Sequence, residues 1–225
     1  SQDGTITLGG PNLSIDDMRS IKNILIIGCG TSYYAGDFAK YKLEELLEIP
    51  VSVEYASEFR YRFGAYDPTS TLAIFMSQSG ETADTLASLS EAKRRQFKTM
   101  GIVNVVGSTI AREVENGGIY LHAGTETAVA STKAYSSMVA ALLMFGGFLS
   151  YKLGRNPNAV RNLTRELRDL PDEIRLTLEL KQQIRKLAPK VKDFKTWFYL
   201  GRGDLYPVAL EGALKLTEVS YVHAQ

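Results

Sequence analysis

Five short apolar runs, separated by polar turns and helical segments, constrain the fold of this chain more than any other feature. They cover residues 23–28, 50–55, 71–76, 100–106 and 118–123. Such continuous apolar runs are typical of strands buried on both faces of a parallel sheet. Helical patterns fill residues 32–48, the stretch from about Thr82, residues 108–114 and residues 134–153. Alternating strands and helices predict an α/β fold with a parallel sheet.

The composition changes after residue 153 and suggests how the chain is divided. The stretch that follows is charged and helical, and we interpret it as two helices broken near Pro171. Residues 197–203 are expected to form a new strand and 206–224 a helix, so that a second α/β unit begins. We therefore predict a lead-in segment, a first domain, a helical linker and the truncated start of a second domain over residues 1–22, 23–153, 154–195 and 196–225.

Charge, hydropathy and cysteine content exclude several classes of protein. Lys and Arg number 26 against 25 acidic residues, which leaves no basic stripe for nucleic acid. No apolar stretch approaches the roughly 18 residues that span a bilayer. The single cysteine, Cys29, excludes an internal disulfide and fits a reducing cytoplasm. His122 and His223 have no second ligand at metal-binding spacing, so both are expected to be structural and no metal site is predicted.

Two polar turns, "GCGTS" (28–32) and "SQSGET" (77–82), follow predicted strands. Ligands of parallel sheets bind beyond the carboxyl ends of the strands, and a helix start offers free N–H groups to an anion. Ser77, Ser79 and Thr82 add hydroxyl groups there. The second turn thus favours a phosphate held by dipoles and hydroxyls rather than by a full cation. The alternative is that Ser79 or Thr82 only caps a helix.

Each of three further features has two possible interpretations, a functional site or an ordinary structural role. Cys29 is either a small buried residue or a thiol that faces a ligand. In the turn at 124–135, Val129, Ser131 and Thr132 either line the same cleft or begin another helix.

The third feature is a row of charges, Glu211, Lys215 and Glu218, which share one helix face. Such a row is usually a salt-bridge ladder. Alternatively, one carboxylate is a general base with a lysine beside it, as proton transfer between adjacent sugar carbons would need.

Several longer motifs carry a specific resemblance. "CGTSYYAG", "ASEFRYR", "MSQSGETADTL", "VASTKAY" and "LGRGDLYPVALEGALKLTE" together resemble the isomerase half of the glucosamine-6-phosphate synthases (glutamine:fructose-6-phosphate amidotransferases), over nearly all of residues 8–225. The resemblance implies a sugar isomerase (SIS) domain, which is a three-layer sandwich with a five-stranded parallel sheet, followed by a second such domain. It also implies fructose 6-phosphate and glucosamine 6-phosphate as ligands, a glutaminase domain as partner, a homodimer, and no cofactor.

The resemblance implies roles for individual residues. Glu218 matches the base that moves a proton between C1 and C2 of the sugar, and Lys215 matches a lysine that assists it. Residues in the 77–82 turn match those that hold the phosphate, and residues of the 28–32 turn match those beside the phosphate and sugar. The positions that match substrate-binding residues are Cys29, Thr31, Ser32, Ser77, Gln78, Ser79, Thr82, Val129 and Ser131.

The sequence also departs from the family pattern. The N-terminal cysteine nucleophile of the glutaminase half, the ring-opening histidine and the lysine that forms a Schiff base with the ketose do not lie within these residues, and His223 is not that histidine. Thr127 and Ala128 replace an aliphatic residue and a glycine. We therefore expect a fragment with little turnover of its own. Two other functions stay open: a regulatory SIS module that only binds a phosphosugar, and a glutamine-independent phosphosugar isomerase or deaminase.

Overall fold

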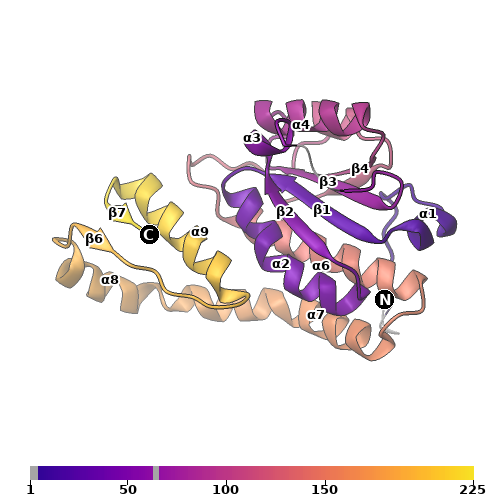
Figure 1. The fold of residues 1–225 in the computed structure, drawn as a ribbon. Coiled ribbons are helices and arrows are strands. Elements are labelled where there is room, and N and C mark those ends of the chain that lie inside the picture. Colours follow the sequence, from indigo (N-terminus) through magenta and orange to yellow (C-terminus); the bar gives the residue numbers. More distant parts are fainter. Residues whose placement is uncertain (1–4, 63–65) are drawn as a thin grey trace.

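A five-stranded sheet lies at the centre of the computed structural model, which describes residues 5–62 and 66–225 (Figure 1). Every strand pairing in this sheet is parallel, and the spatial order is β2-β1-β3-β4-β5. The predicted five-stranded parallel sheet is confirmed. The last two strands end earlier than predicted, at Val103 rather than residue 106 and at Tyr120 rather than residue 123. The strands are β1 (Asn23–Gly28), β2 (Val51–Tyr55), β3 (Thr71–Ser77), β4 (Lys98–Val103) and β5 (Gly118–Tyr120).

Successive residues of the central strands supply opposite faces of the sheet, as strand geometry requires. Ile24 and Ile26 of β1 belong to the apolar cluster beneath α2 (Thr31–Leu47) and α6 (Lys133–Lys152). Leu25 and Ile27 belong to the cluster beneath α3 (Ala56–Phe59), α4 (Ala83–Arg94) and α5 (Thr109–Glu113). Helices therefore cover both faces, as Figure 1 shows, and the predicted three-layer sandwich is confirmed.

Helix α6 is an exception to the prediction that no apolar segment is long enough to span a bilayer. By length and composition alone it is long and apolar enough to cross one, with a mean hydropathy of 1.4 over its most apolar 18-residue window. However, 56% of that window is buried within the protein, where α6 packs against α2 and α7. Burial against two neighbouring helices accounts for its apolar character, since a helix that is apolar all round also suits a protein core.

The N-terminal segment packs onto the first α/β unit. Ile6, Leu13, Met18 and Ile21 are buried in the cluster shared with α2 and α6. Helix α1 (Ile15–Ser20) begins with a capping box in which Ser14 and Asp17 satisfy each other's backbone N–H groups. The boundary predicted at residue 22 stays a prediction, although these contacts join the two segments in one core.

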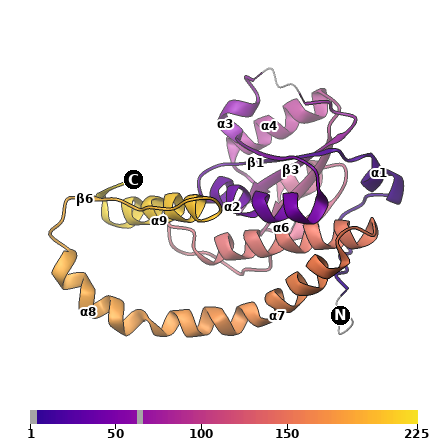
Figure 2. The ribbon, with the colours of Figure 1, turned by 60° about the horizontal axis from the view of Figure 1, so that its bottom comes forward.

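The predicted helix break near Pro171 is wrong. Helix α7 (Pro157–Glu179) continues through this proline, and the chain turns only at Leu180, before α8 (Lys181–Val191). A proline inside a helix removes one hydrogen bond and bends the helix, which need not end it. Figure 2 shows the resulting curved path of α7 and α8 around the outside of the molecule.

The C-terminal residues form a small βαβ unit. The strand predicted at 197–203 is only β6 (Thr196–Trp197), and the helix predicted to residue 224 is α9 (Leu205–Ser220). It ends because Tyr221 adopts a left-handed conformation. The chain then forms β7 (His223–Ala224), which pairs in parallel with β6. Helix α9 packs against α2.

Candidate functional site

The two predicted loops lie together at the carboxyl edge of the sheet. Strand β1 is flanked by β2 on one side and by β3 on the other. The chain therefore leaves β1 and β3 on either side of the point where the strand order reverses. Open α/β sheets bind ligands at this switch point.

The loop after β3 holds a compact group of hydroxyls. The oxygen of Ser77 lies 2.9 Å from that of Thr82 and 3.5 Å from that of Ser79. Two backbone N–H groups point into the loop, since Gly80 donates to Ser77 Oγ at 3.0 Å and Glu81 donates to Ser79 Oγ at 3.1 Å. Thr82 stands at the N-cap of α4 without capping it through its side chain. The hydroxyls of Ser79 and Thr82 thus gather around that of Ser77 at the start of a helix, and the binding of phosphate there stays a prediction.

Residues 108–110, which follow β4, pack against this turn and fix its conformation. Gly80 has a φ of +68° and accepts a hydrogen bond from Ile110 N–H at 3.1 Å. A Cβ on Gly80 would lie only 2.0 Å from Ser108 Oγ, so Ser108 fits against the bare glycine backbone. The Glu81 carboxylate accepts from Thr109 N–H at 2.8 Å, which holds its pKa below the ordinary value. The turn is therefore fixed by a contact that needs a glycine.

The loop after β1 is more buried. Thr31 and Ser32 are both buried, and Ser32 N–H donates to Cys29 O at 3.0 Å as α2 begins. Cys29 is a free, half-buried thiol that packs at the border of the apolar cluster under α3 and α4. Cys29 is therefore neither fully buried nor fully exposed, and its role as a thiol that faces a ligand stays a prediction.

Helix α9 brings a charged group onto this loop from 180 residues further along the chain. Lys215 Nζ donates to Thr31 Oγ1 at 2.9 Å, and Thr31 Oγ1 donates to Glu211 Oε1 at 3.0 Å. Lys215 Nζ also lies 2.6 Å from Glu218 Oε2 and 3.5 Å from Glu211 Oε1. The predicted row of charges is therefore an ion-pair ladder that also touches a candidate site residue.

Glu211 is the most buried member of this group, and the family resemblance gave it no role. Glu211 is only 6% exposed. Burial raises the pKa of Glu211, and this effect outweighs the opposing influence of Lys215 and Thr31. Burial also raises the pKa of Tyr135 on α6 to about 12, with a further contribution from Glu211. The spacing of Glu211 and Lys215 in the sequence predicted a shared helix face. The burial of Glu211 depends on the packing of α9 on α2, so the sequence could not predict it.

The third predicted loop is less closely tied to the other two. Val129 is 95% exposed, and the Ser131 hydroxyl donates to Glu126 Oε2 at 2.8 Å. Glu126 also accepts from Thr132 N–H at 2.7 Å, at the start of α6. Glu126 was missed from the sequence, because nothing in a turn of mixed polar residues marks the acid that organises it.

A polar hollow of about 400 Å³ lies beside this loop at the carboxyl edge. Its lining comes from the ends of β3, β4 and β5 and consists of Gln78, Asn104, Val105, His122, Gly124, Thr125 and Glu126. Gln78, predicted to bind phosphate, is thus part of the wall of this hollow and links it to the hydroxyl loop.

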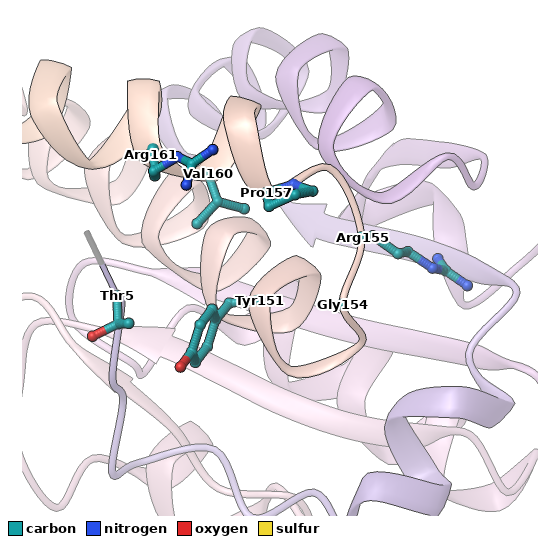
Figure 3. Close-up of a pocket in the computed structure, with 7 residues that line it drawn as sticks. All are labelled: Thr5, Tyr151, Gly154, Arg155, Pro157, Val160 and Arg161. Carbon is teal, nitrogen blue, oxygen red and sulfur yellow. The ribbon is translucent and has the colours of Figure 1, made fainter. Parts of the chain in front are cut away.

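Another cavity, of about 240 Å³, lies at the opposite end of the fold, where α2 and α6 both end (Figure 3). Its charged side chains already have partners, since Arg155 donates to Leu47 O and Arg161 to Asn158. Figure 3 shows Arg155 pointing away from Thr5 and Tyr151. This cavity contains none of the predicted site residues.

Comparison with known proteins gives consistent results. Residues 17–146 match the SIS domain. The chain is 47% identical over its whole length to glutamine–fructose-6-phosphate aminotransferase [isomerizing] of Chlorobaculum tepidum, and 44% identical over 99% of its length to the protein of the same name from Caldanaerobacter subterraneus subsp. tengcongensis. It spans 36% of each of these relatives.

A solved structure gives the same result for the fold. The C-terminal domain of glucosamine-fructose-6-phosphate aminotransferase from Francisella tularensis superposes with a TM-score of 0.90 at 38% identity. The match covers 99% of the present chain and 62% of that structure.

Proposed function

The chain belongs to the SIS domain family, and from this membership we propose that it is the phosphosugar-binding isomerase portion of an enzyme that makes glucosamine 6-phosphate. The substrates of that enzyme are fructose 6-phosphate and ammonia released from glutamine. Relatives at 47% and 44% identity carry the name of this activity. Because the chain spans about a third of their length, the ammonia-releasing step is assigned to a glutaminase portion outside these residues.

The phosphate of the sugar is proposed to bind at the loop after β3. At the start of α4, the Ser77 hydroxyl lies 3.5 Å from that of Ser79 and 2.9 Å from that of Thr82. The N-terminus of a 12-residue helix presents free N–H groups and a positive dipole end to an anion. This chemistry suits a phosphate and does not need a lysine or arginine in the loop.

The proton transfer is proposed to use Glu218, with Lys215 beside it. Ammonia condenses with the C2 carbonyl and water leaves. The carboxylate then takes a proton from C1 while the imine nitrogen gains one from solvent, which gives an enolamine. When the carboxylate returns its proton to C2, the C1 hydroxyl loses its proton to solvent, so that the ketose imine becomes the aldose amine. Lys215 lies 2.6 Å from this carboxylate and can donate to sugar oxygens.

One observation carries the proposal. The hydrogen bond of 2.9 Å from Lys215 to Thr31 brings the acid–base pair of α9 to the strand-end loop next to the hydroxyl loop. A phosphate site and a proton-transferring pair at one sheet edge are what a phosphosugar isomerase needs.

The test is the Glu218→Gln variant in the protein expressed from its complete reading frame. We expect kcat for glucosamine 6-phosphate formation to fall at least about 100-fold, the lower end of the effect of a general base, while fructose 6-phosphate still binds. Glu166→Gln, an exposed change on α7, is the matched control and should leave kcat unchanged. Full activity of Glu218→Gln would contradict the proposed role, and binding without turnover in the parent protein would favour a regulatory phosphosugar-binding module.

We also propose that the protein acts as a homodimer. Large apolar side chains are exposed on the C-terminal unit, including Leu205 and Val219 of α9 and Phe198, and this apolar surface is the part of the unit proposed to pack against a second copy of the chain. Sedimentation of the complete protein as a monomer at high concentration would contradict this proposal.

A further inference from the structure

The loop from His122 to Thr132 is held at both ends by side chains to which the proposed function gives no role. It contains Val129 and Ser131, which match substrate-binding residues of the family, and it is proposed to contact the sugar chain. In such exposed loops, function depends on a rigid scaffold that positions them. The side chains that fix the loop therefore decide where its sugar-contacting residues lie.

Asn104 fixes the first end of the loop. It follows β4, and its side-chain amide makes a two-way clamp on the segment after β5. The amide nitrogen donates to Gly124 O at 2.8 Å, and the amide oxygen accepts from Ala123 N–H at 2.9 Å. Its own backbone N–H donates to Gln78 O at 3.1 Å. One residue thus joins the loops that follow β3, β4 and β5.

Glu126 fixes the other end. Its carboxylate accepts from Ser131 Oγ at 2.8 Å and from the N–H groups of Thr132 at 2.7 Å and Ala134 at 3.3 Å. Burial alone would raise the pKa of Glu126, but these hydrogen bonds outweigh it and lower the pKa. The carboxylate is therefore ionised at neutral pH and ties the loop to the start of α6.

We propose that Asn104 and Glu126 are positioning residues of the phosphosugar site, a role that rests on the proposed function. They fix the 122–132 loop beside the loop after β3, where Gln78 and Glu126 line the same hollow, so that the sugar chain binds between the two loops. The clamp made by the Asn104 side chain acts on the sugar-contacting loop alone, since its link to Gln78 is through the backbone. Its loss should therefore weaken recognition of the sugar and spare recognition of the phosphate.

The experiment compares Asn104→Ala with Asn116→Ala in the protein expressed from its complete reading frame. Asn116 makes the same kind of amide clamp at the opposite, amino edge of the sheet, accepting from Thr99 N–H at 3.1 Å and donating to Asn12 O at 3.4 Å. Each protein is titrated calorimetrically with fructose 6-phosphate and with inorganic phosphate, and its thermal midpoint is recorded. Glu126→Ala serves as a second, independent variant at the other end of the loop.

We expect Asn104→Ala to bind fructose 6-phosphate about tenfold more weakly, as the loss of two positioning hydrogen bonds implies. Its affinity for inorganic phosphate should change less than about twofold, and Asn116→Ala should change neither affinity by more than that. Glu126→Ala should resemble Asn104→Ala.

Three results would overturn the inference: unchanged fructose 6-phosphate binding in Asn104→Ala and Glu126→Ala, an equal loss of phosphate binding, or an equal loss in Asn116→Ala. A parent protein that binds neither ligand would instead overturn the proposed function, and the inference with it.

Discussion

Replacing Gly80 by alanine should destabilise the protein more than the same change at Gly107, a glycine whose φ is also positive. Gly80 has a φ of +68°, where a residue with a Cβ is strained. In addition, the new Cβ would lie 2.0 Å from Ser108 Oγ and 2.5 Å from Ser108 Cβ. Rotation of the Ser108 hydroxyl cannot relieve the contact, because its Cβ stays in place.

The expected loss in the free energy of unfolding has two parts. A left-handed conformation costs a residue with a Cβ about 1–2 kcal/mol, and forcing an extra carbon into a packed site costs about 1–3 kcal/mol. Gly80→Ala should therefore lower the free energy of unfolding by about 2–5 kcal/mol. Gly107 has a φ of +73° and no heavy atom within 4 Å of its ideal Cβ position, so Gly107→Ala should cost only the first part, about 1–2 kcal/mol.

The assay is urea unfolding of both variants and of the double variant Gly80→Ala/Ser108→Gly. Removing the Ser108 side chain should recover the steric part of the loss, about 1–3 kcal/mol, and leave the conformational part. Equal costs at Gly80 and Gly107, or no recovery in the double variant, would refute the explanation that Ser108 fits against a bare glycine.

Further predictions concern the charged groups. Thr31→Val removes the hydroxyl that is hydrogen-bonded to Glu211 and Lys215, so α9 should pack less firmly on α2. We expect faster amide hydrogen exchange in α9, and unchanged exchange would contradict this prediction. Burial raises the folded-state pKa of Glu211 above 4.5, so its stabilising contribution is present below that pH and is lost as pH rises through the raised pKa. Glu211→Gln should therefore gain stability relative to the parent with rising pH, and a gap in urea midpoints that is constant with pH would argue against this. The Asp17 pKa is lowered from 3.8 to about 2 by hydrogen bonds from Lys98 and Ser14, so its contribution is present above 3.8 and is lost as pH falls through about 2. Asp17→Asn should lose this part of the acid sensitivity of unfolding, and an unchanged acid profile would speak against it.

The elements of the first α/β unit could be predicted because local sequence determines them. The apolar runs that became β1 and β3 are buried on both faces, and a polar turn follows each of them. Those turns lie at the switch point whatever the distant packing, so the candidate site could be located from the sequence. The helical linker was less predictable, since Pro171 signals a bend whose outcome depends on how well the flanking turns pack.

The contacts that complete the site could not be predicted, because they join segments far apart in the chain. Thr31 and Glu211 are 180 residues apart, and the burial of Glu211 depends on how α9 packs on α2. Asn104 gives no local signal either, since its amide bonds only to backbone atoms of another loop. Sequence patterns identify strand ends and rows of charged residues. Hydrogen bonds that join one loop to another become visible only in the three-dimensional structure.

The most direct test of the account is a calorimetric titration of the complete protein with fructose 6-phosphate and, separately, with fructose. The parent should bind the phosphorylated sugar and not fructose. Ser79→Ala should weaken binding about tenfold, as expected for one lost hydrogen bond to a charged group. Ser90→Ala, further along α4 with its hydroxyl bonded to Leu86 O, should have no effect. Equal binding of both sugars, or undiminished binding by Ser79→Ala, would contradict a phosphate site in the loop after β3.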